Sequence, residues 1–229
     1  QSEQRRQEFI ANVSHELKTP MTTIGGYVDG ILDGTIPKDN EKHYLQIVSS
    51  EVRRLSRLVR SMLDLSRLQA QGIDESRKTR FDLGDVMSDV LITFEQKINA
   101  RGLQVSVDLP EKPVWTKADR DAITQVVYNL LDNAIKFCPV GGNLGLILEQ
   151  DGQKARLRIR NTGQTIPPEE LPLLFDRFHK ADKARSADRE GWGLGLYIAK
   201  TIIGAHGGEI WATSENGVTE FTFTLPAVR

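Results

Sequence analysis

The strongest constraint on the fold of this chain is its early apolar pattern, which repeats at helical spacing and is interrupted once. Apolar side chains that recur every three or four residues lie on one face of a helix. The first stretch consists of Ile10, Val13, Leu17, Met21, Ile24, Val28 and Ile31, and the second of Leu45, Val48, Val52, Leu55, Val59 and Met62. Between them, residues 33–40 contain glycine and proline. The sequence therefore predicts two long helices in a hairpin, the first kinked by Pro20.

The apolar stripe of this hairpin is wider than two helices bury between themselves. Two hairpins that pair into a four-helix bundle cover it economically, which predicts a homodimer. In the alternative arrangement, the stripe packs against the following domain of the same chain.

The composition excludes several functional classes. Of 229 residues, 39% are hydrophobic and 27% charged, and the net charge of −1 provides no basic surface for nucleic acid. The single cysteine, Cys138, excludes an internal disulfide and a cysteine metal cluster. No apolar run approaches the roughly 20 residues that span a bilayer. Since the chain has neither an initiator methionine nor a signal peptide, we expect a fragment of a longer protein.

After a polar stretch with one glycine the pattern becomes mixed, which predicts domains at 1–72 and 81–229 with a linker at 73–80. Strands and helices that need not alternate indicate an α+β two-layer sandwich with helices on one face of a mixed sheet. Helices are expected at 83–101, 117–137 and 194–205. Strands are expected at 103–107, 144–149 and 155–160, followed by a hairpin over 209–225 that turns at Asn216-Gly217.

His15 stands out within the first helix. With Ile10 as position a of a heptad, His15 falls at position f, away from the apolar seam. An exposed imidazole followed by Glu16, with Thr19 one turn later, is a candidate nucleophile. The other histidines have no partners at zinc-binding spacing and are interpreted as surface or packing residues: His43, His179 and His206.

Three segments of the second domain carry polar groups that a core would exclude. Asn129, Asn133 and Lys136 share one helix face, and amide oxygens suit Mg²⁺ while lysine neutralises phosphate. The turn Gly191 to Leu196 opens into a helix, where free N–H groups favour a phosphate. In the third segment a strand enters a turn at Asn161. The charged stretch 177–190 has the composition of a mobile lid.

In this order, the segments resemble the sensor histidine kinases of two-component signalling, in the subgroup with a HisKA-type dimerisation domain. The resemblance covers essentially the whole chain. His15, with the following Gly25-Gly26-Tyr27, resembles the H box of that family. The remaining boxes are Asn129 to Phe137 (N), Asn161 to Ile166 (G1), Phe175 to Lys180 (F) and Gly191 to Leu196 (G2).

The resemblance implies a dimeric four-helix bundle joined to an ATP-binding domain of the Bergerat type. It implies that His15 accepts the γ-phosphoryl group of ATP, that Glu16 is the general base, and that Thr19 positions a water in a phosphatase reaction. Asn133 would bind Mg²⁺, with Asn129 assisting. The implied nucleotide-binding residues are Asn129, Asn133, Lys136, Phe137, Asn161, Gly163, Ile166, Phe178, Lys180, Gly191, Gly193, Leu194, Gly195 and Leu196.

The same resemblance implies a partner and a location. The partner is the receiver domain of a response regulator, whose aspartate accepts the phosphoryl group. The catalytic portion is expected in the cytoplasm, attached to the membrane only through segments absent from this sequence.

Two positions depart from the family pattern. Asn161 replaces an aspartate that receives the adenine amino group, and Thr165 replaces a glycine, so the loop is expected to follow another path. The loss of charge at Asn161 weakens ATP binding by about tenfold. A kinase-weak scaffold that acts mainly as a phosphatase is therefore the alternative. A gyrase-like ATPase is disfavoured because Asn129 stands where those enzymes carry the glutamate that activates water.

Overall fold

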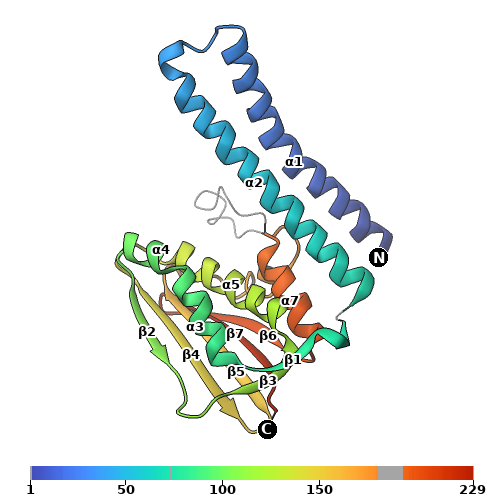
Figure 1. Cartoon of the computed structure of the whole chain (residues 1–229), viewed down its shortest axis with the longest axis vertical. Helices are drawn as coiled ribbons and strands as arrows, with labels where there is room; N and C mark the ends of the chain where they lie inside the picture. Colours follow the sequence, from blue (N-terminus) through green and yellow to red (C-terminus); the bar gives the residue numbers. More distant parts are fainter. Residues whose placement is uncertain (1, 73, 180–192, 229) are drawn as a thin grey trace. The chain divides into compact units, whose positions relative to one another are not determined.

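The computed structural model describes residues 2–72, 74–179 and 193–228. The chain divides into two compact units, the first ending at Ser66 and the second beginning at Arg67. In the first unit, helices α1 (Ser2–Leu32) and α2 (Lys38–Gln71) run side by side in opposite directions (Figure 1). The predicted hairpin is confirmed. Helix α1 continues through Pro20 without a break, and the kink and the domain boundaries at 72 and 81 stay predictions.

The turn between the two helices is held by local hydrogen bonds. Gly34 has a φ of 78°, a conformation that favours glycine at a helix C-terminus. The Asp33 carboxylate accepts from the Thr35 N–H at 2.8 Å, and the Ile36 N–H donates to the Gly30 carbonyl at 2.8 Å. These contacts turn the chain back into α2 within a few residues.

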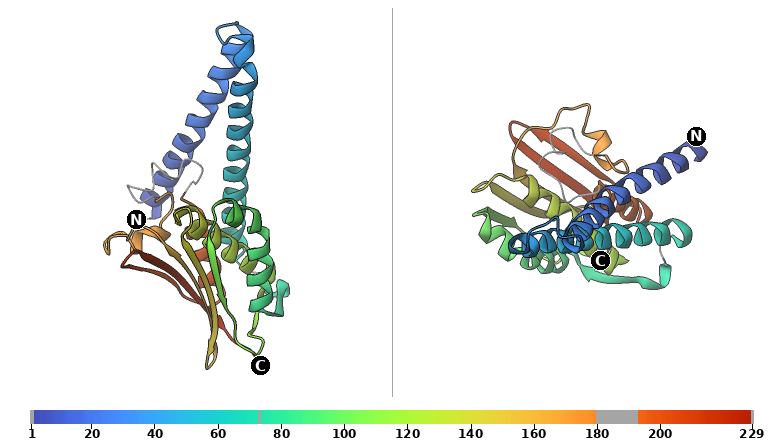
Figure 2. Two further views of the ribbon diagram at one scale, coloured as in Figure 1. Left: turned by 90° about the vertical axis from the view of Figure 1, so that its left-hand side faces the viewer. Right: turned by 90° about the horizontal axis from the view of Figure 1, so that it is seen from above.

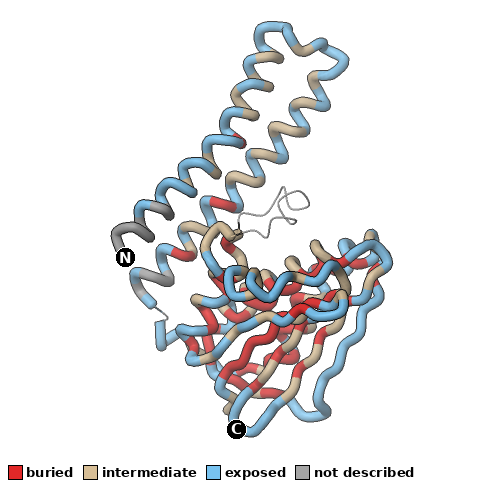
Figure 3. Tube along the Cα trace, turned by 180° about the vertical axis from the view of Figure 1, so that it is seen from behind, coloured by how far each residue is buried: buried red, intermediate tan, exposed pale blue. Residues whose placement is uncertain are grey.

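The hairpin exposes much of its apolar face, and Figure 3 shows few buried positions along it. Met21 is 61% exposed, and large exposed apolar side chains also include Ile10, Leu45, Val52, Val59 and Leu63. Apolar surface of this extent favours association, because each buried side chain contributes about 1.5–3 kcal/mol. We therefore expect this apolar face to be covered by a partner.

The second unit is the α+β domain. Its elements are η1 (Glu75–Arg77), β1 (Lys78–Asp82), α3 (Leu83–Thr93), α4 (Glu95–Ala100), β2 (Gln104–Asp108), β3 (Trp115–Asp119), α5 (Arg120–Phe137), β4 (Asn143–Asp151), β5 (Lys154–Thr162), η2 (Pro172–Phe175), α7 (Gly195–Ala205), β6 (Ile210–Glu215) and β7 (Val218–Pro226).

A five-stranded sheet of order β2-β4-β5-β7-β6 forms one layer of this domain. β2 is parallel to β4 and the other pairs are antiparallel, so the sheet is mixed. Helices α3, α5 and α7 cover one face (Figures 1 and 2). Strand residues on that face, such as Leu146, Leu157 and Phe223, are fully buried. The predicted α+β fold is confirmed.

The predicted boundaries of two helices were wrong. The helix expected over 83–101 is two helices, because Phe94 leaves helical geometry with φ −98° and ψ 0°. Its ring is buried against Tyr128, with the ring centres 4.7 Å apart. The helix expected from Lys117 begins at Arg120, because residues 115–119 form β3 and pair with β1, which overlaps the end of the expected linker. In both places a long-range contact overrides local helical pattern.

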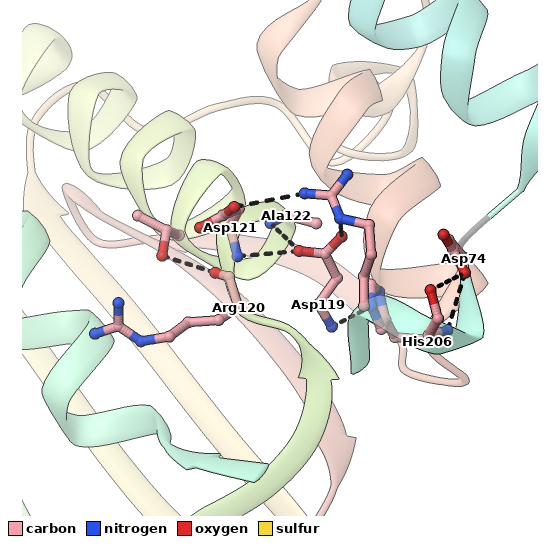
Figure 4. Close-up of polar contacts among 9 residues, drawn as sticks. Asp74, Asp119, Arg120, Asp121, Ala122 and His206 are labelled. Atoms are coloured by element: carbon pink, nitrogen blue, oxygen red, sulfur yellow. Dashed lines mark hydrogen bonds and ion pairs between the residues drawn. The ribbon is translucent and has the colours of Figure 1, made fainter. Parts of the chain in front are cut away.

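Asp119 joins three parts of the domain (Figure 4). Its carboxylate accepts from the N–H groups of Asp121 and Ala122 at 3.1 and 3.2 Å, which caps α5. Arg77 lies 3.2 Å from the same carboxylate. The Asp119 N–H donates to Nε2 of buried His206 at 3.1 Å, while Nδ1 lies 2.8 Å from the Ile202 carbonyl. Since Nδ1–H donates and Nε2 accepts, His206 is neutral and ties the end of α7 to the start of α5.

We expect the stability of this domain to fall in mild acid. Burial lowers the pKa of His206 below its usual 6.5, and the charge of Lys78 adds to this effect, while the Ile202 carbonyl, Asp119 and Glu75 oppose it. The unfolded chain therefore binds more protons at this site, so the contribution of neutral His206 is complete above pH 6.5 and is lost as pH falls through the folded pKa. Urea unfolding at pH 7.5 and 5.5 measures this change.

The matched variant for this test is His206→Ala. It leaves the Asp119 N–H without its partner, so the free energy of unfolding at pH 7.5 falls by about 1–3 kcal/mol. The difference between the free energies of unfolding at pH 7.5 and pH 5.5 should also become smaller. An undiminished pH dependence in this variant would assign the effect to other groups. His43→Ala is the control, because His43 is exposed on α2.

Candidate active site

The predicted nucleophile lies on an open helix surface. His15 is exposed in the middle of α1, and its ring makes no hydrogen bond to the residues that the structure describes. The Thr19 hydroxyl, one turn later, donates to the His15 carbonyl at 3.4 Å. Glu16 is half-buried beside it. The imidazole is accessible to a bulky phosphoryl donor, which a buried histidine is not.

Helices α5 and α7 meet at Asn129. This half-buried amide donates from Nδ2 to the Gly195 carbonyl at 3.1 Å, and a Cβ on Gly195 would lie 3.6 Å from the amide carbon. Gly195 is the first residue of α7, and Leu194 before it provides no side-chain cap. The first N–H groups of α7 are thus available to an anion beside the Asn129 amide.

The next predicted residues follow on the same helix. Asn133 is half-buried, and its amide makes no hydrogen bond within residues 2–72, 74–179 and 193–228. An amide oxygen in this state fits a Mg²⁺ ligand. The Lys136 ammonium lies 6.0 Å from the ring centre of Phe137. At the end of α5, a Cβ on Gly163 would lie 2.9 Å from the Phe137 carbonyl, so the loop after β5 touches this helix.

Asn161 is the second-last residue of strand β5, just before that loop. It is 3% exposed, and its Nδ2 donates to the Thr162 carbonyl at 3.0 Å. This contact assigns the amide orientation, because the Oδ1 atom in the same place would repel the carbonyl. Among the described residues, Oδ1 has no hydrogen-bond partner. An amide oxygen in this state can accept a hydrogen bond, though without a negative charge.

The segment after η2 approaches the start of α7. The Phe178 N–H donates to the Gly193 carbonyl at 2.9 Å, and both residues have positive φ, 59° and 66°. A Cβ on Gly193 would lie 2.7 Å from the His179 carbonyl, so only glycine fits there. Arg177 donates to the Tyr197 hydroxyl at 2.7 Å. Lys180, Gly191 and nearly all of the expected lid, 177–190, lie outside the described residues.

The structure brings several predicted residues together. Asn129 is hydrogen-bonded to Gly195, Phe137 lies against Gly163, and Phe178 is hydrogen-bonded to Gly193. Among the described residues, neither Asn133 nor Ile166 makes a hydrogen bond to another predicted site residue. Within the described ranges, no cluster of three His, Cys, Asp or Glu side chains suits a metal ion.

Sequence reasoning missed the supports of the loop 163–166. Ser214 accepts from the Ile166 N–H at 2.8 Å, and the Thr165 hydroxyl accepts from the Gly217 N–H at 2.9 Å. Thr165 does not adopt a positive φ. The turn at Asn216-Gly217 was the only local signal, and it indicated a hairpin rather than a contact.

Two family descriptions match consecutive parts of the chain. "His Kinase A (phospho-acceptor) domain" matches residues 5–71, and "Histidine kinase-, DNA gyrase B-, and HSP90-like ATPase" matches residues 118–229. Sensor protein SrrB of Staphylococcus aureus (strain MRSA252) is 38% identical over 226 residues, which are 98% of this chain and 38% of SrrB. The chain therefore spans well under half the length of this relative.

Two solved structures are similar over most of the chain. The histidine kinase AdeS of Acinetobacter baumannii is 30% identical with a TM-score of 0.76, and the match covers 94% of this chain and 98% of that chain. The histidine kinase ThkA, solved in complex with the response regulator protein TrrA, is 28% identical with a TM-score of 0.78, covering 96% and 61%. In the described part of this chain, no helix has the apolar length needed to cross a membrane.

Proposed function

This chain belongs to the histidine kinases of two-component systems, and we propose that it transfers the γ-phosphoryl group of ATP to His15 and then to an aspartate of a response regulator. The observation that carries the proposal is the exposed His15 on a phosphoacceptor-type helix, in one chain with an ATPase-type domain. Since the chain covers 38% of its relative SrrB, we propose that signal sensing belongs to other parts of the whole protein.

In the proposed reaction, the unprotonated ring nitrogen of His15 attacks the γ-phosphorus in line. A nitrogen–phosphorus bond forms, the bond from phosphorus to the β–γ bridging oxygen breaks, and ADP leaves. The proton on the other ring nitrogen passes to a base. Glu16 is the proposed base, since it is the adjacent carboxylate and only half-exposed. Thr19 is proposed to position water when the phosphorylated regulator is hydrolysed.

The residues around α5 fit a nucleotide bound with Mg²⁺. Asn133 would hold the ion, with Asn129 assisting, and the bound ion would neutralise phosphate charge. Lys136 and Lys180 are proposed to contact phosphates, and the N–H groups at Gly193, Leu194 and Gly195 to bind them. Asn161 would accept a hydrogen bond from adenine. Asn129 has no acid–base chemistry, so transfer to a histidine is favoured over hydrolysis.

Two partners follow from this proposal. A second copy of the chain would cover the exposed apolar face of the hairpin, and the receiver domain of a response regulator would dock beside His15, as ThkA is complexed with TrrA.

We expect twice the mass of one chain in sedimentation equilibrium. Leu63→Asp, on the 53% exposed side chain of α2, should halve that mass, whereas a monomeric wild-type protein would contradict the dimer.

The second candidate function is a phosphatase scaffold with weak kinase activity, and the uncharged Asn161 favours it. Calorimetric titration with a non-hydrolysable ATP analogue separates the two functions. Binding at micromolar to submillimolar concentration supports the kinase. No binding at millimolar nucleotide would leave the scaffold.

The direct test is incubation with Mg²⁺ and γ-labelled ATP. We expect a covalent label that is lost in acid and survives base, which is the behaviour of a phosphorylated histidine. A folded protein that takes up no label would contradict the kinase, and steady release of phosphate without label would indicate the gyrase-like ATPase.

A further inference from the structure

The loop after β5 is fastened to the tip of the β6–β7 hairpin at one residue of the turn. The Gly163 N–H donates to the Gly217 carbonyl at 2.9 Å, and the Gly217 N–H donates to the Thr165 hydroxyl at 2.9 Å. Gly217 therefore receives one hydrogen bond from the loop and gives another back to it. The two bonds close a ring between segments 52 residues apart in the sequence.

A buried pair of hydroxyls holds the far end of the same loop. The Ile166 N–H donates to Ser214 Oγ at 2.8 Å, and Ser214 Oγ lies 2.9 Å from Thr219 Oγ1. Ser214 is 6% and Thr219 5% exposed, so water competes little for these bonds. The loop is thus fixed at three successive points along 163–166.

The hairpin tip that makes these bonds is a tight two-residue turn. Asn216 and Gly217 have φ values of 51° and 76°, the left-handed pair of a two-residue hairpin turn. A Cβ on Gly217 would lie 3.4 Å from the Gly163 carbonyl, so loop and turn are already in close contact. On its other side, the loop lies against the Phe137 carbonyl at the end of α5.

We infer that Thr165 is a positioning residue, whose hydroxyl holds the loop 163–166 in the form that binds nucleotide. The inference rests on the proposed nucleotide site. A glycine at this position would provide no hydroxyl for the Gly217 N–H, so the departure from the family pattern supplies the contact that orders this loop. Restoring the family residue here should weaken nucleotide binding, because the loop must then be ordered upon binding.

The test compares Thr165→Val, Thr165→Ser and Thr165→Gly in the whole chain. Thr165 is exposed, so the valine variant removes the hydroxyl without a cavity. We expect the Val and Gly variants to raise the Kd of an ATP analogue and the KM for ATP by about fivefold, the value of one hydrogen bond, with kcat unchanged. The Ser variant should remain within about twofold of wild type.

Amide hydrogen exchange in nucleotide-free protein provides a second measurement. The Gly217 amide should exchange faster in the Val and Gly variants than in wild type and the Ser variant. Thr213→Val is the matched control, since Thr213 is an exposed threonine of β6 with no hydroxyl bond to the described residues. It should change neither exchange at Gly217 nor nucleotide affinity.

The outcomes separate this inference from the proposed function. Wild-type affinity and Gly217 protection in both the Val and Gly variants would overturn the role of Thr165, as would tighter nucleotide binding by the glycine variant. Faster exchange without any change in Kd would also overturn it, because the bond would then be structural only. Wild-type protein that binds no nucleotide would overturn the proposed function itself, while the exchange rates would still report whether the bond forms.

Discussion

Replacing His15 with glutamine is expected to abolish the acid-labile label, a loss of at least about a thousandfold in transferred phosphoryl group. Glutamine has no nucleophilic nitrogen, because its amide lone pair is delocalised. The fold should persist, since His15 is exposed and its ring has no partner within the described residues. Labelling of the variant after separation on a gel, with circular dichroism to check helix content, measures both effects.

His43→Gln is the matched control for this experiment. His43 is also exposed and lies on α2 of the same hairpin, and among the described residues its ring makes an edge contact with the Tyr44 ring, with the ring centres 5.5 Å apart. We expect full labelling in this variant. Label that persists in His15→Gln and disappears in His43→Gln would assign the phosphoacceptor to α2 and refute the proposed role of His15.

The second large effect is expected for Asn133→Ala, with kcat lowered by about a hundredfold or more. Loss of residues that only support a metal ligand already costs about 10–100-fold, and Asn133 is the proposed ligand itself. Its side chain has no protein hydrogen bond to lose in the described ranges, so the effect should not arise from unfolding. Autophosphorylation rates over a Mg²⁺ titration should show that higher Mg²⁺ partly restores the variant.

Gln125→Ala provides the comparison for Asn133. Gln125 is another half-buried amide of α5, two turns earlier, and it also makes no hydrogen bond to the described part of the chain. Its variant should keep wild-type kcat and Mg²⁺ dependence. If Asn133→Ala behaved in the same way, the ion would have to be held by other residues, of which Asn129 is the first candidate.

Much of the fold was predictable because its signals are local. The apolar spacing of three and four residues predicted α1 and α2, and the glycine turn at Gly217 marked a hairpin that the structure contains. The wrong boundaries arose where distant residues decide the conformation. Phe94 ends α3 because its ring is buried against Tyr128, and β1 forms only because β3 lies beside it.

In the candidate site, too, local features were predictable and contacts between distant residues were not. The order and spacing of its residue types placed Asn129 and Asn133 on one helix and Gly195 at the start of another, without showing that Asn129 binds the Gly195 carbonyl 66 residues away. The departures at Asn161 and Thr165 were visible in the sequence, yet the contacts that these two side chains make were not. Only the structure shows that the Asn161 amide donates a hydrogen bond to the Thr162 carbonyl, and that the Thr165 hydroxyl accepts one from the Gly217 N–H.

The sequence alone therefore determined the two long helices α1 and α2, the hairpin turn at Asn216-Gly217, the kinase family and the exposure of His15. Each depends on neighbours within a few positions or on residue types in a fixed order. The tertiary structure decided which hydrogen bonds close between distant segments, such as that from Asp119 to His206, 87 residues apart, and that from Gly217 to Thr165. The physical reason is that a lone polar group has many partners available to it, and only packing of the whole chain selects one.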